Sequence, residues 1–253
     1  MRHRNALVAE FVGLPGVGKT TVSEKVAAKL AAEDIQLITR PEILEQWHQA
    51  SRWGGIRQFF PANVNHWKLL LNSLALAAQV RPLSSWSFSK ALKVFSNAKR
   101  NDAVVRTENH QVVLLEQGPL QEVWAVLLKG RVNHSNTFSS TLKREIALLA
   151  HQRPMVVVYS KTDIETSMFR IKARPKKNDC PFDVMNLEVL HSSLATYFPY
   201  LQSIIKEARN HGILVLEVDA SASAEAQSDE IAEWILRQVS GHRKLQKALT
   251  FQP

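Results

Sequence analysis

The chain of 253 residues is poor in cysteine and has no long hydrophobic run. Cys180 is its only cysteine, which excludes an internal disulfide and a cysteine-based metal site and is typical of a reducing compartment. The longest apolar stretch, residues 67–80, is interrupted by polar residues and is too short to span a bilayer. Low-complexity segments and internal repeats are also absent. We therefore expect one globular, cytoplasmic domain over residues 1–253, without a membrane partner.

Negative charge is scarce relative to positive charge. The chain has 32 Lys and Arg residues against 23 Asp and Glu residues, a formal net charge of +9 at pH 7. A field of this sign attracts polyanions, which include nucleotides, phosphorylated metabolites, nucleic acid and anionic lipid. The charge alone does not choose among these partners. The basic segment from Gly241 is interpreted as a solvated helical end, with contact to an acidic partner as the alternative.

The most specific motif is a glycine-rich loop, GLPGVGKT, at residues 13–20. An apolar run at residues 7–11 precedes it and suits a buried parallel strand, and apolar residues at helical spacing follow it. A strand, a G-x-x-x-x-G-K-T loop and a helix together predict a phosphate-binding loop, in which backbone N–H groups and the positive end of the helix hold a polyphosphate. Lys19 is expected to reach the β- and γ-phosphates of ATP, and the Thr20 hydroxyl to ligate Mg²⁺. The residues predicted to contact the nucleotide here are Gly13, Pro15, Gly16, Val17, Gly18, Lys19, Thr20 and Thr21.

Two carboxylates follow apolar runs of strand length. Glu116 ends such a run within QVVLLEQ, at residues 111–117. Because ligands gather at the carboxyl ends of strands in open α/β sheets, Glu116 is predicted to act on the metal side of the nucleotide, the alternative being a surface carboxylate at a strand end. Glu42 follows a strand predicted at residues 35–39 and is a candidate base for an acceptor hydroxyl. The alternative for Glu42 is an acid in the first turn of a helix, favoured by the helix dipole.

A cationic helix is predicted after the strand at residues 155–159. In SKTDIETSMFRIKARPKKND, Arg170 and Arg174 are four residues apart and therefore lie on one helical face. A planar guanidinium binds phosphate oxygens in pairs and stabilises charge that spreads in the transition state. We predict a lid over residues 163–180 that acts on the phosphates; the alternative is a solvated cationic face.

Together these elements resemble the nucleoside and nucleotide kinases of the thymidylate kinase and deoxynucleoside kinase group, within the P-loop nucleoside triphosphate hydrolase superfamily. The segment TRPEILEQW adds to the resemblance, because Glu42 precedes Trp47 by five residues, as at that group's second-strand mouth. The resemblance implies a three-layer α/β fold with a parallel five-stranded sheet in the order 2-3-1-4-5, helices on both faces, and ATP as donor. It also implies that adenine lies between the lid arginines and the loop at residues 218–221, with Ala220 as a contact.

The acceptor side departs from this group. There the acid of the third strand is usually followed by an arginine that grips the acceptor's phosphate or supports the base, whereas Gln117 follows Glu116 here. The acceptor site is therefore sought in residues 48–110, which are predicted to form a helical insertion between strands two and three. This segment mixes aromatic residues with amides and cations, a combination that suits a ring or sugar bearing a negative group.

The favoured hypothesis is a kinase that transfers the γ-phosphoryl group of MgATP to a small acceptor, such as a nucleoside, nucleotide or sugar. Lys19 and the lid arginines would stabilise the migrating charge, with Thr20 and Glu116 at the metal. One alternative is an ATPase or GTPase switch for a protein partner, for which SKTD at residues 160–163 is the nearest guanine-recognition candidate. Another is a kinase of nucleic-acid ends, which would use the net positive charge. The oligomeric state is left open.

Overall fold

The computed structural model describes residues 6–54, 64–107, 110–128, 131–132, 136–151, 154–174 and 182–250. It contains a five-stranded sheet in which all neighbouring strands are parallel, in the order β2-β4-β1-β6-β7. Numbered along the chain among themselves, these strands have the order 2-3-1-4-5, so the predicted sheet is confirmed. The strands are β1 (Leu7–Gly13), β2 (Leu37–Thr39), β4 (Val112–Leu115), β6 (Met155–Lys161) and β7 (Leu214–Asp219).

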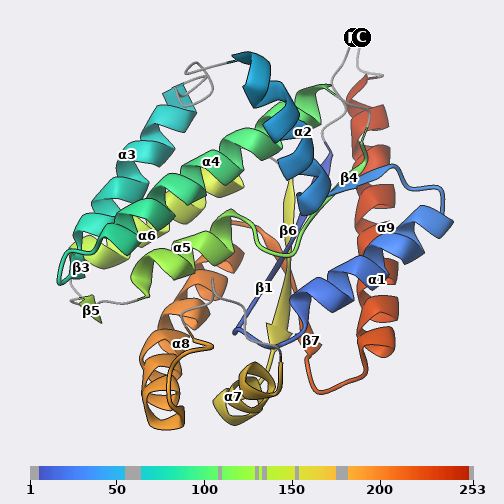
Figure 1. The fold of residues 1–253 in the computed structure, drawn as a ribbon. Coiled ribbons are helices and arrows are strands. Elements are labelled where there is room, and N and C mark those ends of the chain that lie inside the picture. The colour runs from blue at the N-terminus through green and yellow to red at the C-terminus, as the bar shows by residue number, and fades with distance from the viewer. Residues whose placement is uncertain are drawn as a thin grey trace.

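β1 lies at the centre of the sheet, and all seven of its residues are buried. Alternate side chains of a strand point to opposite faces. Leu7, Ala9 and Phe11 pack with apolar residues of α1 and α9, whereas Val12 joins the core formed with α5 and α8. The sheet therefore lies between two helical layers (Figure 1). The helices of these layers are α1 (Lys19–Ala32), α9 (Ala224–Thr250), α5 (Pro119–Leu127) and α8 (Leu187–Asn210).

The chain between β2 and β4 is mainly helical, as predicted for residues 48–110. α3 packs on α4 and α6, and α4 packs on α5, so these helices extend the layer on the α5 side of the sheet (Figure 1). None of the described helices is both long enough and apolar enough to cross a membrane. The elements between β2 and β4 are α2 (Arg40–Gly54), α3 (Val64–Ala78), β3 (Val80–Arg81) and α4 (Ser85–Thr107). Two elements that pack against them follow β4 in the chain: α6 (Asn136–Ala150), and β5 (Arg131–Val132), which pairs antiparallel with β3.

The carboxyl ends of the parallel strands meet at one edge of the sheet, the position at which ligands bind in open α/β folds. At this edge β1 runs into the loop before α1, and β4 runs into the turn before α5. β2 continues directly into α2, and β6 leads into α7 (Ile164–Ala173). Four segments that are distant in the sequence therefore meet where the site was predicted.

Candidate functional site

The loop between β1 and α1 has the conformation that its glycines permit. Gly16 and Gly18 have φ angles of 82° and 88°, in the left-handed region that other residues rarely adopt. Gly18 is the N-cap of α1, which begins at Lys19. The first N–H groups of a helix have no intrahelical partner, so this loop and the helix dipole behind it form an anion-binding end.

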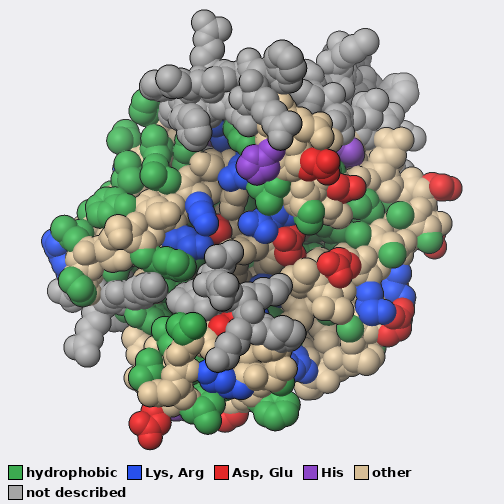
Figure 2. All heavy atoms as spheres, viewed as in Figure 1, with side chains coloured by type: hydrophobic (Ala, Val, Ile, Leu, Met, Phe, Trp, Pro, Cys, Tyr) green, Lys and Arg blue, Asp and Glu red, His purple; other side chains and the backbone are tan. Residues whose placement is uncertain are grey.

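A cleft of about 700 Å³ opens at this edge of the sheet. Among the described residues, five cationic side chains and one carboxylate line it, and Figure 2 shows Lys and Arg side chains gathered at the centre of this face. The wall therefore favours a strongly anionic ligand. The lining residues are Pro15, Gly16, Val17, Gly18, Lys19, Thr20, Thr21, Arg40, Trp86, Lys90, Glu116, Gln117, Gln121, Trp124, Ala125, Leu128, Arg170, Arg174 and Phe182.

Lys19 lies on the cleft wall and bonds to its own loop. Its Nζ donates to the carbonyl oxygens of Gly13 (2.8 Å) and Leu14 (2.9 Å). Phosphate oxygens would compete for the same ammonium group, because a charged acceptor binds it more strongly than a carbonyl does. Gly13 itself does not line the cleft; it is buried, and its N–H donates to Gln121 Oε1 at 3.0 Å. Gly13 thus anchors the start of the loop to Gln121 of α5, whereas the other predicted loop residues line the cleft.

Glu116 also lies on the cleft wall, where it is paired with Arg40. The Nη1 of Arg40 is 3.0 Å from Oε1 of Glu116, and both side chains are partly buried. Arg40 is the first residue of α2, directly after β2, and β2 is the strand next to β4. A cation therefore lies beside Glu116, although position 117 is a glutamine. The sequence analysis missed Arg40, although the predicted strand order places the ends of these two strands side by side.

Glu42 does not join this group. Its Oε2 accepts hydrogen bonds from the backbone N–H and the hydroxyl of Thr39, each at 2.7 Å. The Glu42 side chain is exposed and turned back toward the start of α2, and it is not part of the cleft wall. This geometry matches the alternative interpretation of Glu42 as an acid in the first helical turn, where it satisfies a free N–H and the helix dipole.

Arg170 and Arg174 both reach the cleft from α7 and its C-cap. Arg174 is held by Asp183: its Nε and Nη2 lie 3.2 Å and 2.7 Å from Oδ1 of that aspartate, which is buried. Asp183 was not predicted as a site residue. Residues 175–181 are outside the described part of the chain, so only the helical part of the lid predicted over 163–180 can be placed.

The lid helix packs directly on the phosphate-binding loop. The hydroxyl of Ser167 donates to the carbonyl of Pro15 at 2.7 Å. A Cβ at Gly16 would lie 3.0 Å from the carbonyl oxygen of Ser167 and 3.1 Å from Cγ1 of Ile171. Gly16 therefore has two roles, since it adopts a left-handed φ and lets the helix approach closely.

Ala220 is not brought to the cleft. It is fully buried, and its N–H donates to the carbonyl of Lys161 at 2.9 Å, which extends the pairing of β6 with β7. The neighbouring Asp219 accepts hydrogen bonds from the N–H and the hydroxyl of Ser221, each at 2.8 Å. The Ala220 N–H is thus bonded to β6, and the Asp219 carboxylate is bonded to Ser221 within the loop. The adenine contact implied for Ala220 has no counterpart in the cleft wall.

A buried carboxylate supports the site from inside the sheet. Glu10, in the middle of β1, accepts hydrogen bonds from the N–H groups of Gln121 (2.7 Å) and Leu120 (3.2 Å) in the first turn of α5. Burial raises the pKa of Glu10 to about 8, although these N–H groups act in the opposite direction. Gln121 in turn accepts the N–H of Gly13. The start of α5 is thereby fixed to β1 and to the phosphate-binding loop.

The opposite wall of the cleft combines an aromatic ring with paired charges. The Nζ of Lys90, from α4, is 4.9 Å from the centroid of the Trp86 ring and 3.1 Å from Oε2 of Glu122. The other carboxylate oxygen of Glu122 accepts from Nε2 of Gln117 at 2.9 Å. Aromatic faces with a few fixed polar groups are typical of sites that bind a ring.

The cleft wall also fits a magnesium ion that enters with a nucleotide. Proteins usually bind Mg²⁺ through one or two oxygen ligands together with substrate phosphates and water. Thr20 would supply a hydroxyl ligand, and Glu116, on the same cleft wall, would hold one of the ion's water molecules. Across the described ranges, no cluster of three or more His, Cys, Asp or Glu side chains could hold a metal ion by itself. A metal here would therefore depend on the nucleotide for the rest of its ligands.

Comparison with known proteins gives one family match. The model of the deoxynucleoside kinase family matches residues 11–240. No curated protein matches the chain. Similar solved structures include the deoxyadenosine kinase from M. mycoides with the products dCMP and a flexible dCDP (12% identity, TM-score 0.47, covering 91% of this chain and 99% of that chain) and with bound dATP (13% identity, TM-score 0.47, covering 91% and 98%). Because the family match spans most of its length, the chain belongs to the deoxynucleoside kinase family and is a phosphotransferase that uses ATP.

Proposed function

We propose that the protein transfers the γ-phosphoryl group of ATP to a hydroxyl or phosphate of a nucleoside-like acceptor, which binds between α2, α4 and α5. The observation that carries this proposal is the set of residues that line the cleft. The phosphate-binding loop, Glu116, both lid arginines and Trp86 all line a single cleft. Donor and acceptor subsites in one cleft are what a direct transfer requires, because the two reactants must be held in contact.

In the proposed reaction, an acceptor oxygen forms a bond to the γ-phosphorus while the bond from that phosphorus to the β–γ bridging oxygen breaks, and ADP leaves. Lys19, Arg170 and Arg174 neutralise charge on the phosphoryl oxygens. Glu116 takes the proton of the acceptor, because it is the carboxylate of the described cleft wall. A bound Mg²⁺ supplies further neutralisation of the phosphates.

The GTPase alternative has less support. Its guanine-recognition candidate ends at Asp163, whose carboxylate oxygens accept from the N–H and the hydroxyl of Thr166. Asp163 is the N-cap of α7, and these bonds lower its pKa. The carboxylate therefore has a structural role at the start of the lid helix.

A label-transfer assay tests the proposal. The γ-phosphate of ATP is labelled and followed to a panel of deoxynucleosides, nucleosides, their monophosphates and sugars, with ADP release measured in parallel. Release of ADP at one rate with every acceptor, and no labelled acceptor, would contradict a kinase.

Matched carboxamide variants test the role of Glu116. We expect Glu116→Gln to lower kcat by about 10²- to 10⁴-fold, the usual contribution of a general base, while the affinity for ADP is retained. Glu42→Gln is the control, and its kcat should stay within about threefold of wild type because Glu42 caps α2 outside the cleft. A full rate in Glu116→Gln together with a lost rate in Glu42→Gln would reverse the assignment.

A further inference from the structure

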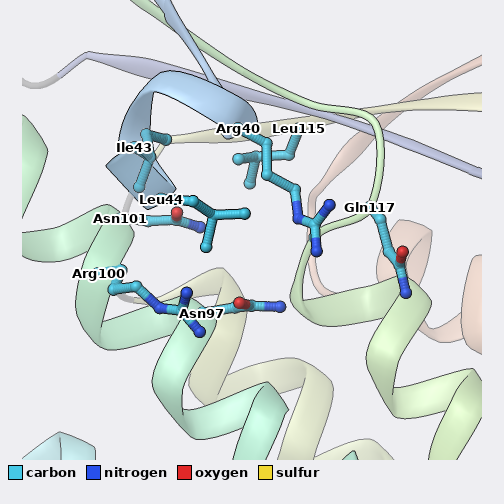
Figure 3. A pocket seen from close by; sticks show the side chains of 9 residues that line it. Arg40, Ile43, Leu44, Asn97, Arg100, Asn101, Leu115 and Gln117 are labelled. Atoms are coloured by element: carbon cyan, nitrogen blue, oxygen red, sulfur yellow. The ribbon is translucent and has the colours of Figure 1, made fainter. Parts of the chain in front are cut away.

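Gln121 lies in the cleft wall, beside the start of the phosphate-binding loop. The chain leaves β4, passes Gln117 and enters α5, and Figure 3 shows Gln117 in this connecting segment. Gln121 follows in the first turn of α5 and lines the cleft. Because β4 is the strand next to β1, the start of α5 lies beside the end of β1, where the loop begins.

The side-chain amide of Gln121 has a fixed orientation. Its Oε1 accepts the N–H of Gly13 at 3.0 Å, and a backbone N–H can bond only to the oxygen of an amide. The nitrogen, Nε2, makes no hydrogen bond to any described residue, and it is not enclosed by protein. Because Gln121 lines the cleft and Gly13 does not, the oxygen faces the loop and Nε2 is open to the cleft.

The backbone of Gln121 is restrained as well. Its N–H donates to Oε1 of Glu10 at 2.7 Å, and the N–H of Leu120 donates to the other oxygen of the same carboxylate at 3.2 Å. Only 6% of Gln121 is exposed. A donor whose backbone and side chain are both held in place loses little conformational entropy when it binds a ligand.

Lys19 and Gln121 are bonded to the same residue of the loop. Nζ of Lys19 donates to the carbonyl of Gly13 at 2.8 Å, and the Gln121 amide holds the N–H of Gly13. In a phosphate-binding loop the lysine reaches the β- and γ-phosphates of the nucleotide. The open Nε2 of Gln121 is therefore a second donor close to the group that acts on these phosphates.

We infer that Nε2 of Gln121 donates a hydrogen bond to an oxygen of the γ-phosphoryl group of ATP; the inference rests on the proposed kinase function. Gln121 then has two roles, since its oxygen anchors Gly13 and its nitrogen binds the nucleotide. A hydrogen bond to a charged group is stronger than one between neutral groups, so its loss should weaken the binding of a triphosphate about tenfold or more. ADP has no γ-phosphoryl group, and its affinity should not depend on this donor.

Calorimetric titration of the full chain with two nucleotides tests this inference. Each protein is titrated, in the presence of Mg²⁺, with ADP and with a non-hydrolysable ATP analogue, and the ratio of the two affinities isolates the contribution of the γ-phosphoryl group. Gln121→Glu keeps an oxygen for the Gly13 N–H and removes the donor, whereas Gln121→Met removes both. In both variants we expect the ATP analogue to lose about tenfold or more in affinity relative to ADP.

The two variants separate this role from that of a loop anchor. If Gln121 only anchored Gly13, Gln121→Glu would bind both nucleotides like wild type, and Gln121→Met would lose affinity for both in equal proportion. An unchanged ratio of the two affinities in either variant would therefore overturn the inference. Gln202→Glu and Gln202→Met, at an exposed position of α8, are the matched controls and should bind like wild type. Failure of the wild-type protein to bind ADP would instead contradict the proposed kinase function.

A measurement on the wild-type protein keeps the test decisive if a variant does not fold. The side-chain amide proton resonances of Gln121, assigned by through-bond NMR correlations, should move downfield with the ATP analogue and not with ADP. The same resonance positions in both complexes would overturn the inference.

Discussion

Asp183 fixes the direction in which Arg174 presents its guanidinium to the cleft. The pair is asymmetric in exposure: the Arg174 side chain is 29% exposed, whereas that of Asp183 is only 1% exposed. A buried carboxylate bonded through two guanidinium nitrogens restrains both position and rotation of the group. Asp183 is therefore a positioning residue for the lid. It lies nine residues after its partner and outside the predicted helix, so the spacing of the two arginines gave no sign of it.

In Asp183→Asn, a neutral amide replaces the carboxylate that binds Arg174. The amide cannot bind the guanidinium as strongly, so Arg174 will occupy several orientations at the cleft. We expect kcat to fall about tenfold, equivalent to about 1.4 kcal/mol of transition-state stabilisation, with a smaller change in ADP affinity. Steady-state kinetics and ADP titration measure the two effects. Asp229→Asn, at an exposed site on α9, is the control, and a loss of ADP affinity without loss of kcat would contradict the positioning role.

The direction of single side chains limited what could be predicted at this scale. Lys19, Thr20 and Glu116 were predicted because each belongs to a pattern that fixes its place at a strand end or helix start. Glu42 also follows a strand, but it is the third residue of α2, and the helical backbone sets the direction of its side chain. The side chain accepts a hydrogen bond from the backbone N–H of Thr39 instead of facing the cleft. Arg40 was missed because its importance depends on a neighbour 76 residues away.

Among the elements, α7 and the phosphate-binding loop form one contact surface. Ser167 bonds to Pro15, and the backbone of α7 lies against Gly16 with no room for a side chain. A shift of α7 would therefore have to move this loop as well or break the hydrogen bond between Ser167 and Pro15. The loop and the lid should therefore be treated as one unit in binding.

Gly16→Ala tests this contact. A Cβ would be both strained at a φ of 82° and too close to the lid backbone, so it must shift α7 or the loop. We expect ATP affinity to fall by about tenfold or more. Gly241→Ala is the matched control: a Cβ there meets nothing within 4 Å, and alanine is the better helix former, so affinity should be unchanged. Calorimetric titration compares the two, and equal affinities would contradict the coupling of lid and loop.

The strands of the sheet could be located in the sequence because each is a short apolar run, whereas their order was expected only from the resemblance to a kinase group with that order. The helical character of residues 48–110 was predictable from the length of the connection. Its internal arrangement was not, since the packing of α4 on α5 and the pairing of β3 with β5 join segments that share no local pattern.

At the scale of the whole molecule, two buried carboxylates make folding dependent on pH. Burial raises the pKa of Glu10 to about 8 and that of Glu145, which bonds to Asn72 and Ser73 across α3 and α6, to about 7. Both groups are therefore protonated in the folded chain at pH values where the unfolded chain, with a pKa near 4.5, has lost the proton. Their contribution to stability is fully present below pH 4.5 and is lost as the pH rises through these folded values.

Glu10→Gln should flatten this dependence. Because glutamine does not titrate, we expect the free energy of unfolding to fall less steeply between pH 5 and pH 8. The slope should change by at most about 1.4 kcal/mol per pH unit, the value for one proton. Urea unfolding at several pH values measures the slope. Glu233→Gln, at a side chain that is 69% exposed, is the control and should leave the slope unchanged. An unaltered slope in Glu10→Gln would show that Glu10 is ionised in the folded protein.

The absence of a side chain at position 118 has an evolutionary consequence. A Cβ there would lie 2.5 Å from Cδ of Glu10, so the carboxyl group can reach the start of α5 only past a glycine. Among descendants of a common ancestor, these two positions, 108 residues apart, cannot diverge independently. A lineage that acquires alanine at 118 must also move or replace the Glu10 side chain, and such paired changes would trace the history of this contact.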